Sequence, residues 1–195
     1  MSLTTNDKPK AAQRIQEAAK ELFYRQGIRA TGVEEVCRAA DATKMSLYRN
    51  YPSKDALVCA ILEDCAEEYE AWFQAAINGA DGAAGKLRAL VAAAATKIGS
   101  SDDRGCPLLL AQAEFPDPEH PTHKLVVRFK SEARRRYAAL AAEAGAQDPA
   151  LLADTLLVLW EGAWSALAYM GRERAAQVLR DTAETLLTTQ LNGSG

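Results

Sequence analysis

The sequence predicts an all-α protein, and two observations support this fold class. Apolar residues recur at spacings of three and four rather than alternating, which is the period of an amphipathic helix. Alanine, leucine and glutamate dominate while β-branched residues are sparse, and this composition favours helices over strands. The chain of 195 residues can bury a sizeable core without disulfides or structural metals. We therefore expect helices throughout and no strand.

The first predicted helix covers residues 7–26. Asp7 can cap this helix, Pro9 suits its first turn, and Gly27 ends it. Its apolar residues share one face, as expected for a helix that packs against a core. They are Ile15, Ala18, Ala19, Leu22 and Phe23.

Two short helices separated by a tight turn are predicted next. The first of them is expected to begin at Thr31, because Thr31 and Glu34 form a capping-box pattern before an apolar face. The other runs on from Thr43, a second potential cap, until Pro52 stops it. Such a pair indicates a helix-turn-helix, whose second helix enters the major groove of DNA.

Longer helices are predicted for the rest of the chain. Ser53 can cap a helix that continues toward Asn78 and Gly79. Loops rich in Gly, Asp, Ser and Pro separate the later helices. These are expected at about residues 85–98, 108–114, 121–144, 149–170 and 172–191.

Charge is unevenly spread along a chain whose formal net charge is −3. Residues 1–54 hold about 10 Lys and Arg against about 6 Asp and Glu, whereas acidic residues are in excess over residues 55–195. This asymmetry predicts a DNA-binding domain at 1–54 and a larger domain at 55–195 that need not touch DNA. No signal peptide and no apolar run of roughly 18 residues is visible, so a soluble, cytoplasmic protein is expected.

The outer face of the third helix carries the candidate DNA-binding groups. It mixes cations, hydroxyls and an amide, which hydrogen-bond phosphates and base edges. The same charges could also belong to an ordinary solvated face. The outward residues are Lys44, Met45, Ser46, Tyr48, Arg49 and Asn50.

The segment from Ala42 to Lys54, ATKMSLYRNYPSK, resembles the signature of the TetR (tetracycline-repressor-like) family. The two preceding helical segments match the same family in order and spacing, so the resemblance covers about the first quarter of the chain. Met45 stands where the family usually has a small residue, and it could contact a thymine methyl group. Tyr51 stands where phenylalanine is common, and its hydroxyl needs a partner.

The resemblance implies a DNA-binding regulator with roles for particular residues. In such proteins the residues matching Lys44 and Met45 face base edges, and most of the others hold phosphates. Lys54 lies at a helix N-terminus, where the backbone amides and the helix dipole also favour an anion. The DNA-binding residues expected in this way are Thr31, Thr43, Lys44, Met45, Ser46, Tyr48, Arg49, Asn50 and Lys54.

The resemblance also implies that the C-terminal domain dimerises and binds an effector. The last two long helices would pair with their symmetry mates as a four-helix bundle. A wholly intramolecular core would use the same apolar stripes. The expected interface residues are Leu152, Thr155, Leu156, Leu159, Ala163, Ala166, Val178 and Leu186.

Aromatic and apolar side chains line most small-molecule sites, so they are the candidates for an effector pocket. The same side chains are equally compatible with a plain core, and the ligand does not follow from their types. These candidates are Trp72, Phe73, Cys106, Leu109, Phe115, Phe129, Trp160 and Trp164.

A metal or redox site is a minor alternative. His120 and His123 have an HxxH spacing and could bind a metal with Glu114 or Cys106, but the neighbouring prolines predict a loop in which His120 caps or packs. Cys106 could be a redox-sensitive thiol, although no resolving cysteine is visible. We therefore expect reduced thiols and no metal or cofactor.

The working hypothesis is a repressor that binds a palindromic operator in double-stranded DNA as a homodimer and is released by a small-molecule effector. An enzyme is one alternative, although no nucleophile elbow, phosphate-binding glycine loop or catalytic dyad is visible. A helical adaptor that binds only proteins is another. Such an adaptor would tolerate substitution of Lys44 or Tyr48.

Overall fold

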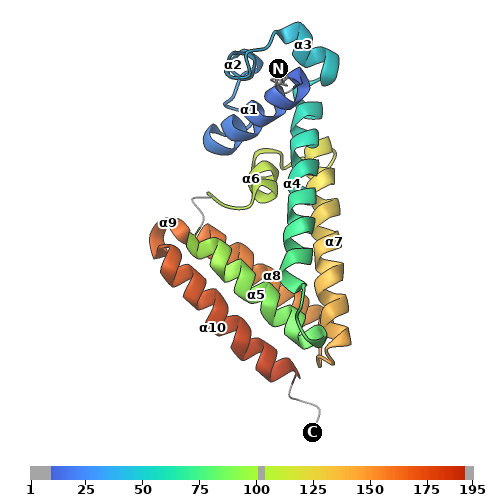
Figure 1. Ribbon diagram of the computed structural model, residues 1–195, viewed down its shortest axis with the longest axis vertical. Coiled ribbons are helices and arrows are strands. Elements are labelled where there is room, and N and C mark those ends of the chain that lie inside the picture. The colour runs from blue at the N-terminus through green and yellow to red at the C-terminus, as the bar shows by residue number, and fades with distance from the viewer. Residues whose placement is uncertain (1–9, 101–103, 192–195) are drawn as a thin grey trace, which may run out of the picture. The chain divides into compact units, whose positions relative to one another are not determined.

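The computed structural model describes residues 10–100 and 104–191. Every regular element in this part of the chain is a helix, which confirms the all-α prediction (Figure 1). The helices are α1 (Ala11–Gln26), α2 (Val33–Ala39), α3 (Lys44–Asn50), α4 (Lys54–Ile77), α5 (Gly82–Ser100), α6 (Pro107–Glu114), α7 (Pro121–Glu143), α8 (Pro149–Ser165), α9 (Leu167–Met170) and α10 (Arg172–Leu191).

The chain forms two compact units. The first consists of Met1–Cys65 and Pro107–Val126, and the second of Ala66–Cys106 and Val127–Gly195. Long helices α4 and α7 therefore have residues in both units. The first unit is called the head below, and the second is called the body. The head thus includes a segment from the middle of the sequence, whereas the division by function at residue 54 stays a prediction.

The ends of the short helices follow from a few side-chain contacts. Gly27 ends α1 with φ of +98°, as predicted, because glycine adopts this region without strain. Asp7 and Pro9 lie outside the described residues. The Thr43 hydroxyl accepts the Ser46 N–H at 3.1 Å, which confirms the predicted cap of α3. The cap predicted at Ser53 is also confirmed, since its Oγ accepts the Ala56 N–H at 3.0 Å.

The predicted capping box at Thr31 is wrong. Helix α2 begins at Val33 with Gly32 as its N-cap, and no side chain caps it. Thr31 is fully buried, and its hydroxyl donates instead to the Gly27 carbonyl oxygen at 2.8 Å. The hydroxyl therefore closes the turn after α1 and does not cap α2.

In the head, α1 packs against both α2 and α3. The residues that meet there are fully or almost fully buried, and Leu47 is the buried residue of α3. The Tyr51 hydroxyl donates to Gln16 Oε1 at 2.7 Å, so the partner that the sequence required is present. The core of these helices includes Ile15, Ala19, Phe23, Val36, Cys37 and Leu47.

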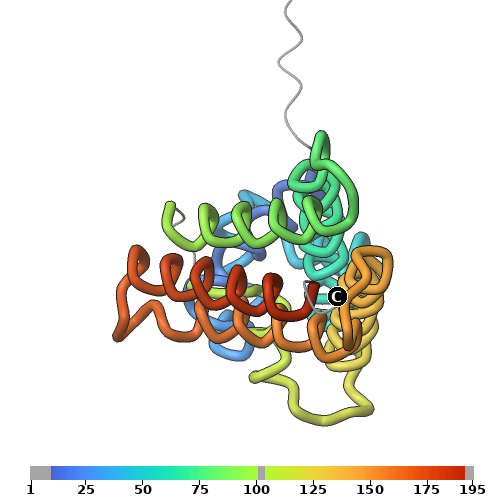
Figure 2. Tube along the Cα trace, turned by 90° about the horizontal axis from the view of Figure 1, so that it is seen from below, coloured from blue at the N-terminus to red at the C-terminus, as the bar shows by residue number. Residues whose placement is uncertain are grey.

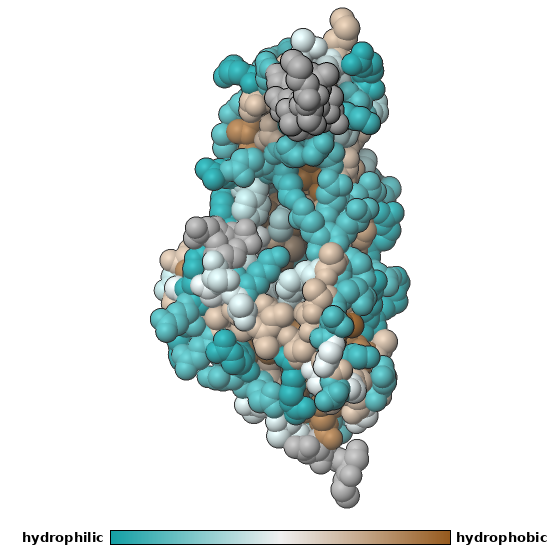
Figure 3. Space-filling model, viewed as in Figure 1, coloured by the Kyte–Doolittle hydropathy of each residue, from teal (hydrophilic) through white to brown (hydrophobic). Residues whose placement is uncertain are grey.

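In the body, α10 packs against α5 and α8, and the three helices lie side by side in both views (Figures 1 and 2). The helix predicted at 149–170 ends at Ser165, and a short α9 follows until Gly171, whose φ is +77°. On the face seen in Figure 3, strongly hydrophobic residues appear only as small patches, because the apolar stripes are turned inward. The main apolar cluster includes Phe73, Leu87, Leu90, Tyr137, Leu152, Leu156 and Leu187.

Within the described residues, none of the helices has both the length and the apolar character that crossing a membrane requires.

Candidate functional site

Helix α3 presents a polar face to solvent above one buried anchor. Leu47 is 0% exposed, whereas Met45 is 80% and Tyr48 48% exposed. Lys44, Arg49 and Asn50 are also exposed, and Ser46 is half-buried. Because the anchor fixes the rotation of the helix, the predicted outward residues of α3 share the solvent side. These side chains supply cations, hydroxyls and an amide for phosphates and base edges.

Two polar side chains also form hydrogen bonds with the backbone of α3 itself. The Thr43 hydroxyl caps the helix, and Asn50 Nδ2 donates to the Ser46 carbonyl oxygen at 2.7 Å. Both side chains therefore stabilise the ends of a helix only seven residues long.

The Lys44 ammonium forms an ion pair with Glu34, which lies in the first turn of α2. The hydrogen bond between them raises the pKa of Lys44 and lowers the pKa of Glu34. Both side chains remain more than half exposed. Sequence reasoning used Glu34 only as a capping residue and missed this pair. Its signal in the sequence is that both residues begin helices joined by one tight turn.

Two predicted DNA contacts, Thr31 and Lys54, are engaged inside the head. The Lys54 ammonium donates to the carbonyl oxygens of Ile28 at 2.5 Å and Thr31 at 2.7 Å, and it lies 5.7 Å from the Phe23 ring centroid. Burial lowers the pKa of Lys54, while Glu114 and Asp55 oppose that shift. In this conformation both side chains hold the segment between α1 and α2.

Glu114, the last residue of α6, also holds this segment. Its carboxylate accepts the N–H groups of Ile28 at 2.8 Å and Arg29 at 2.7 Å. The guanidinium of Arg29 lies 5.3 Å from the centroid of the Phe115 ring. Sequence reasoning considered Glu114 only as a metal ligand and had no signal for this contact across 85 and 86 residues.

The two histidines have separate roles in the head. The His120 ring stacks on Phe115 with centroids 4.3 Å apart, and its Nδ1 accepts the Thr122 N–H at 3.2 Å. This confirms that His120 caps and packs in a loop. The Nδ1 of His123 lies 3.1 Å from the Phe115 carbonyl oxygen. Among the described residues, no three His, Cys, Asp or Glu side chains gather as metal ligands.

The helices that carry this interface match a known family. The family described as "Bacterial regulatory proteins, tetR family" matches residues 15–61, which extend from α1 into α4. The HTH-type transcriptional regulator YjdC of Escherichia coli is 27% identical over 170 residues, covering 87% of this chain and 89% of YjdC. The chain belongs to the TetR family of transcriptional regulators. It is therefore a DNA-binding protein with a helix-turn-helix formed by α2 and α3.

Solved structures of TetR-family regulators have the same fold. A TetR-family transcriptional regulator from Streptomyces coelicolor superposes with a TM-score of 0.88 at 29% identity, covering 93% of this chain and 96% of that protein. A TetR transcriptional regulator from Chloroflexus aurantiacus gives a TM-score of 0.80 at 20% identity, covering 92% and 95% of the two chains. The likeness thus extends beyond the helix-turn-helix to the body of this TetR-family chain.

The predicted effector residues of this regulator do not form one group. Trp72, Phe73 and Trp160 lie in one aromatic cluster of the body, where the Trp72 and Trp160 centroids are 4.7 Å apart. Tyr69, which sequence reasoning missed, joins them at 5.6 Å from Trp72. Burial raises its pKa to about 12. Leu109 lies on α6 and Phe115 follows it in the head, Phe129 is half-buried on α7, and Trp164 belongs to a second apolar cluster.

The body, which contains the aromatic cluster, also has a group of interacting polar side chains. The Lys130 ammonium is 2.8 Å from Glu161 Oε1 and also interacts with the Cys106 thiol. Attraction to these two groups outweighs burial and raises the pKa of Lys130. Cys106 is half-buried and, like Cys37, Cys59 and Cys65, does not form a disulfide.

The predicted dimer residues of the TetR-family body differ in exposure. Leu152, Leu156 and Ala166 are at most 5% exposed within one chain, so little of their surface is available to a partner, and their place in a dimer interface stays a prediction. They are covered because they form part of the body's own core or its edge. Thr155, Leu159, Ala163, Val178 and Leu186 are half-buried. The exposed large apolar residues of α8 and α9 are Leu151, Val158, Tyr169 and Met170, at 54%, 67%, 80% and 37%.

Proposed function

We propose that this TetR-family chain is a cytoplasmic repressor that binds a palindromic operator as a homodimer and releases it when a small-molecule effector binds the body. Residues 1–54 supply the DNA contacts, and residues 55–195 supply dimerisation and effector binding. The single observation that carries the proposal is the exposed polar face of α3 above the buried Leu47. The activity is binding, and no catalytic step is required.

Each α3 helix would enter the major groove of one half-site. Lys44 and Met45, at its first turn, would face base edges, because recognition helices read bases with their N-terminal residues. Tyr48, Arg49 and Asn50 would contact phosphates, with Ser46 beside them. Thr31 and Lys54 are left out of this contact set, since both are engaged in the head.

A stripe along α8 and α9 supports the homodimer. Positions separated by three or four residues share one helical face, and those at 151, 158 and 169 carry exposed apolar side chains. A Cβ at Gly162 would meet nothing within 4 Å, so the described chain does not cover this position, and the missing side chain would let a second helix approach closely. A two-fold operator requires a dimer whose recognition helices are about one DNA turn apart. The stripe consists of Leu151, Thr155, Val158, Gly162, Ser165 and Tyr169.

The aromatic cluster around Trp72 and Trp160 supports an effector site. Rings and a few polar groups in one apolar region are typical of small-molecule sites. The Lys130–Glu161 pair supplies polar groups in the same unit. A ligand that binds one arrangement of the body better than another shifts the population of DNA-competent dimers.

Selection of bound duplexes from a random library tests DNA recognition. We expect the wild-type chain to enrich a palindrome and the Lys44→Ala, Tyr48→Phe double variant to enrich none. Lys97→Ala removes an exposed cation from α5 in the body and should behave as the wild type. If the wild type enriches no sequence at low salt, with or without added metabolite pools, the proposal fails.

Sedimentation of the wild type and of Val158→Glu tests the dimer. The wild type should sediment as a dimer, and a carboxylate in the centre of the α8 stripe should give monomers. Val127→Glu places the same charge at another exposed apolar position, on α7, and should remain dimeric. A monomeric wild type at micromolar concentration would contradict the homodimer.

A further inference from the structure

The ion pair between Glu34 and Lys44 lies on the surface that the proposed function assigns to DNA. Its side chains are 65% and 54% exposed. Exposed ion pairs of this kind contribute little to folding stability, because solvent screens the charges. Stabilising the contact between α2 and α3 is therefore not the main effect that we expect of this pair.

Hydrogen bonds from other groups hold the turn between the two helices. Arg14 donates from Nε to the Ala40 carbonyl oxygen and from a terminal nitrogen to that of Asp41, both at 3.1 Å. The Ala42 N–H donates to the Cys37 carbonyl oxygen at 2.9 Å. The start of α2 and the start of α3 are thus fixed relative to each other. Glu34 then restricts the direction of the Lys44 side chain.

Pairing changes what the Lys44 ammonium offers to DNA. Lysine has three N–H donors, and Glu34 occupies one, which leaves two for acceptors such as O6 and N7 of guanine. An unpaired ammonium on a flexible side chain would bind any nearby phosphate, whatever the DNA sequence. A phosphate must instead compete with Glu34, whose negative charge also repels it.

We propose that Glu34 is a positioning residue for DNA specificity: it holds the Lys44 ammonium for base edges and withholds it from phosphates. This inference rests on the proposed role of α3 in DNA recognition. The pair has no net charge, so it releases few counterions from DNA and adds little to non-specific binding. It therefore adds to the affinity only for DNA sites whose base edges present hydrogen-bond acceptors to Lys44.

The experiment compares Glu34→Gln with Glu35→Gln in the full-length chain. Both substitutions remove one carboxylate from the first turn of α2, but only Glu34 is paired with Lys44. Affinity is measured against salt for the duplex that the wild type selects and for a scrambled duplex of the same composition. Equal thermal unfolding temperatures of the two variants would exclude a folding effect.

For Glu34→Gln we expect tighter binding to the scrambled duplex and a steeper salt dependence, by about 0.9 in log–log slope for each half-site. The ratio of specific to non-specific affinity should fall about tenfold, the order that one base contact supplies. Glu35→Gln should change this ratio little. In a Lys44→Gln background, Glu34→Gln should have no larger effect than Glu35→Gln, because there is no ammonium to release.

Two results would overturn the inference while leaving the proposed function intact. In one, Glu34→Gln and Glu35→Gln have the same slopes and the same specificity ratio. In the other, Glu34→Gln loses specific binding even in the Lys44→Gln background, which would mean that Glu34 contacts a base itself. A wild type that selects no sequence would instead remove the proposed function, and this inference with it.

Discussion

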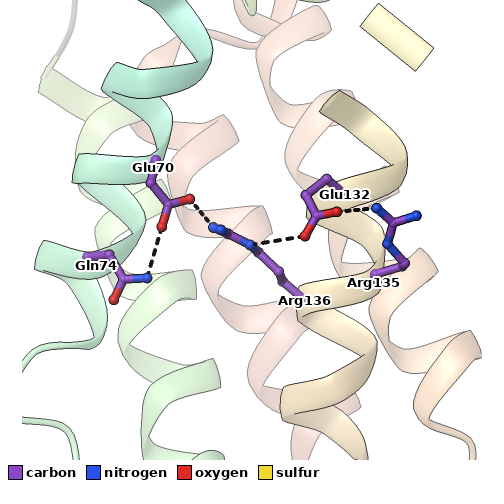
Figure 4. A network of polar contacts seen from close by, with 5 residues as sticks. All are labelled: Glu70, Gln74, Glu132, Arg135 and Arg136. Carbon is purple, nitrogen blue, oxygen red and sulfur yellow. Dashed lines mark hydrogen bonds and ion pairs between the residues drawn. The ribbon is translucent and has the colours of Figure 1, made fainter. Parts of the chain in front are cut away.

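The head and the body are both helical, but different interactions hold them. In the head, charged side chains bind backbone groups: Lys54 binds two carbonyls, Glu114 two amides, and Arg14 two further carbonyls. In the body, large apolar clusters fill the space between helices. Its ion pairs join side chains to one another, as in the network that includes Glu70 and Arg136 (Figure 4).

Helix length explains this difference. Helices α2 and α3 have seven residues each and present only one or two buried side chains, so apolar burial alone cannot hold their ends. Their connecting segments have backbone groups that need partners, and charged side chains supply them. Helices such as α5, with 19 residues, bury a whole stripe instead. The head therefore adds a few charged contacts with backbone groups to its apolar core, whereas the body has larger apolar clusters.

The largest effect is expected from a cavity in the body. Leu87→Ala removes a fully buried side chain of the main cluster and should lower the free energy of unfolding by about 2–5 kcal/mol. Denaturant unfolding followed by circular dichroism measures this loss. Val127→Ala, at an exposed position of α7, should change it by less than about 0.5 kcal/mol. Similar losses for both variants would show that packing does not dominate the body.

The next effect concerns Lys54. Lys54→Met keeps an apolar stem but leaves two carbonyl oxygens without this donor. The free energy of unfolding of the head should therefore fall by about 2 kcal/mol. Faster hydrogen exchange at residues 28–31, with unchanged exchange in α10, would measure the loss. Lys97→Met controls for the loss of one charge. If the DNA salt slope falls by about 0.9 for each half-site in Lys54→Met alone, Lys54 binds a phosphate as the family resemblance implied.

Glu114 should have a smaller effect. Glu114→Gln has only one acceptor oxygen where the carboxylate has two, so it cannot accept both N–H groups in the same way. We expect the free energy of unfolding of the head to fall by about 1 kcal/mol. The amides of Ile28 and Arg29 should exchange faster by hydrogen-exchange mass spectrometry. Glu119→Gln, in the exposed loop before α7, provides the control. Unchanged exchange at both amides would contradict a structural role for Glu114.

The smallest effect is expected from the surface network in the body. Hydrogen bonds from Arg136 and Gln74 lower the pKa of Glu70, so its contribution is present above the pKa of the unfolded chain and is lost as pH falls through the folded pKa. Arg136→Met should cost less than about 1 kcal/mol at pH 7, because the pair is partly exposed. The difference from wild type should shrink below about pH 4, as measured by denaturant unfolding. A difference that grows on acidification would contradict this account.

Local signals predicted much of the head correctly. The cap at Thr43, the end of α1 at Gly27 and the need of Tyr51 for a partner all follow from residue type and spacing. The cap at Thr31 was predicted in the same way and is wrong, because its hydroxyl bonds a carbonyl four residues earlier. A capping pattern states which groups could pair, and burial decides which of them do.

In the body the sequence predicted the helices, but it did not specify which face of each helix is buried. Helix α8 is apolar on several sides, so periodicity did not distinguish Leu152, which is buried, from Leu151, which is exposed. The aromatic candidates were likewise chosen by type. Packing places Trp72 and Trp160 together, whereas Phe115 stacks on His120 in the head.

The helical class, most helix ends and the family to which the head belongs could be predicted from the sequence, because these depend on residues close together in the chain. Three features became visible only in the folded chain: Lys54 and Glu114 hold the segment after α1, Glu34 pairs with Lys44, and one face of α8 is exposed. These features join residues from different helices. Periodicity and capping rules describe one helix at a time, so they cannot specify how charges and faces from separate helices meet.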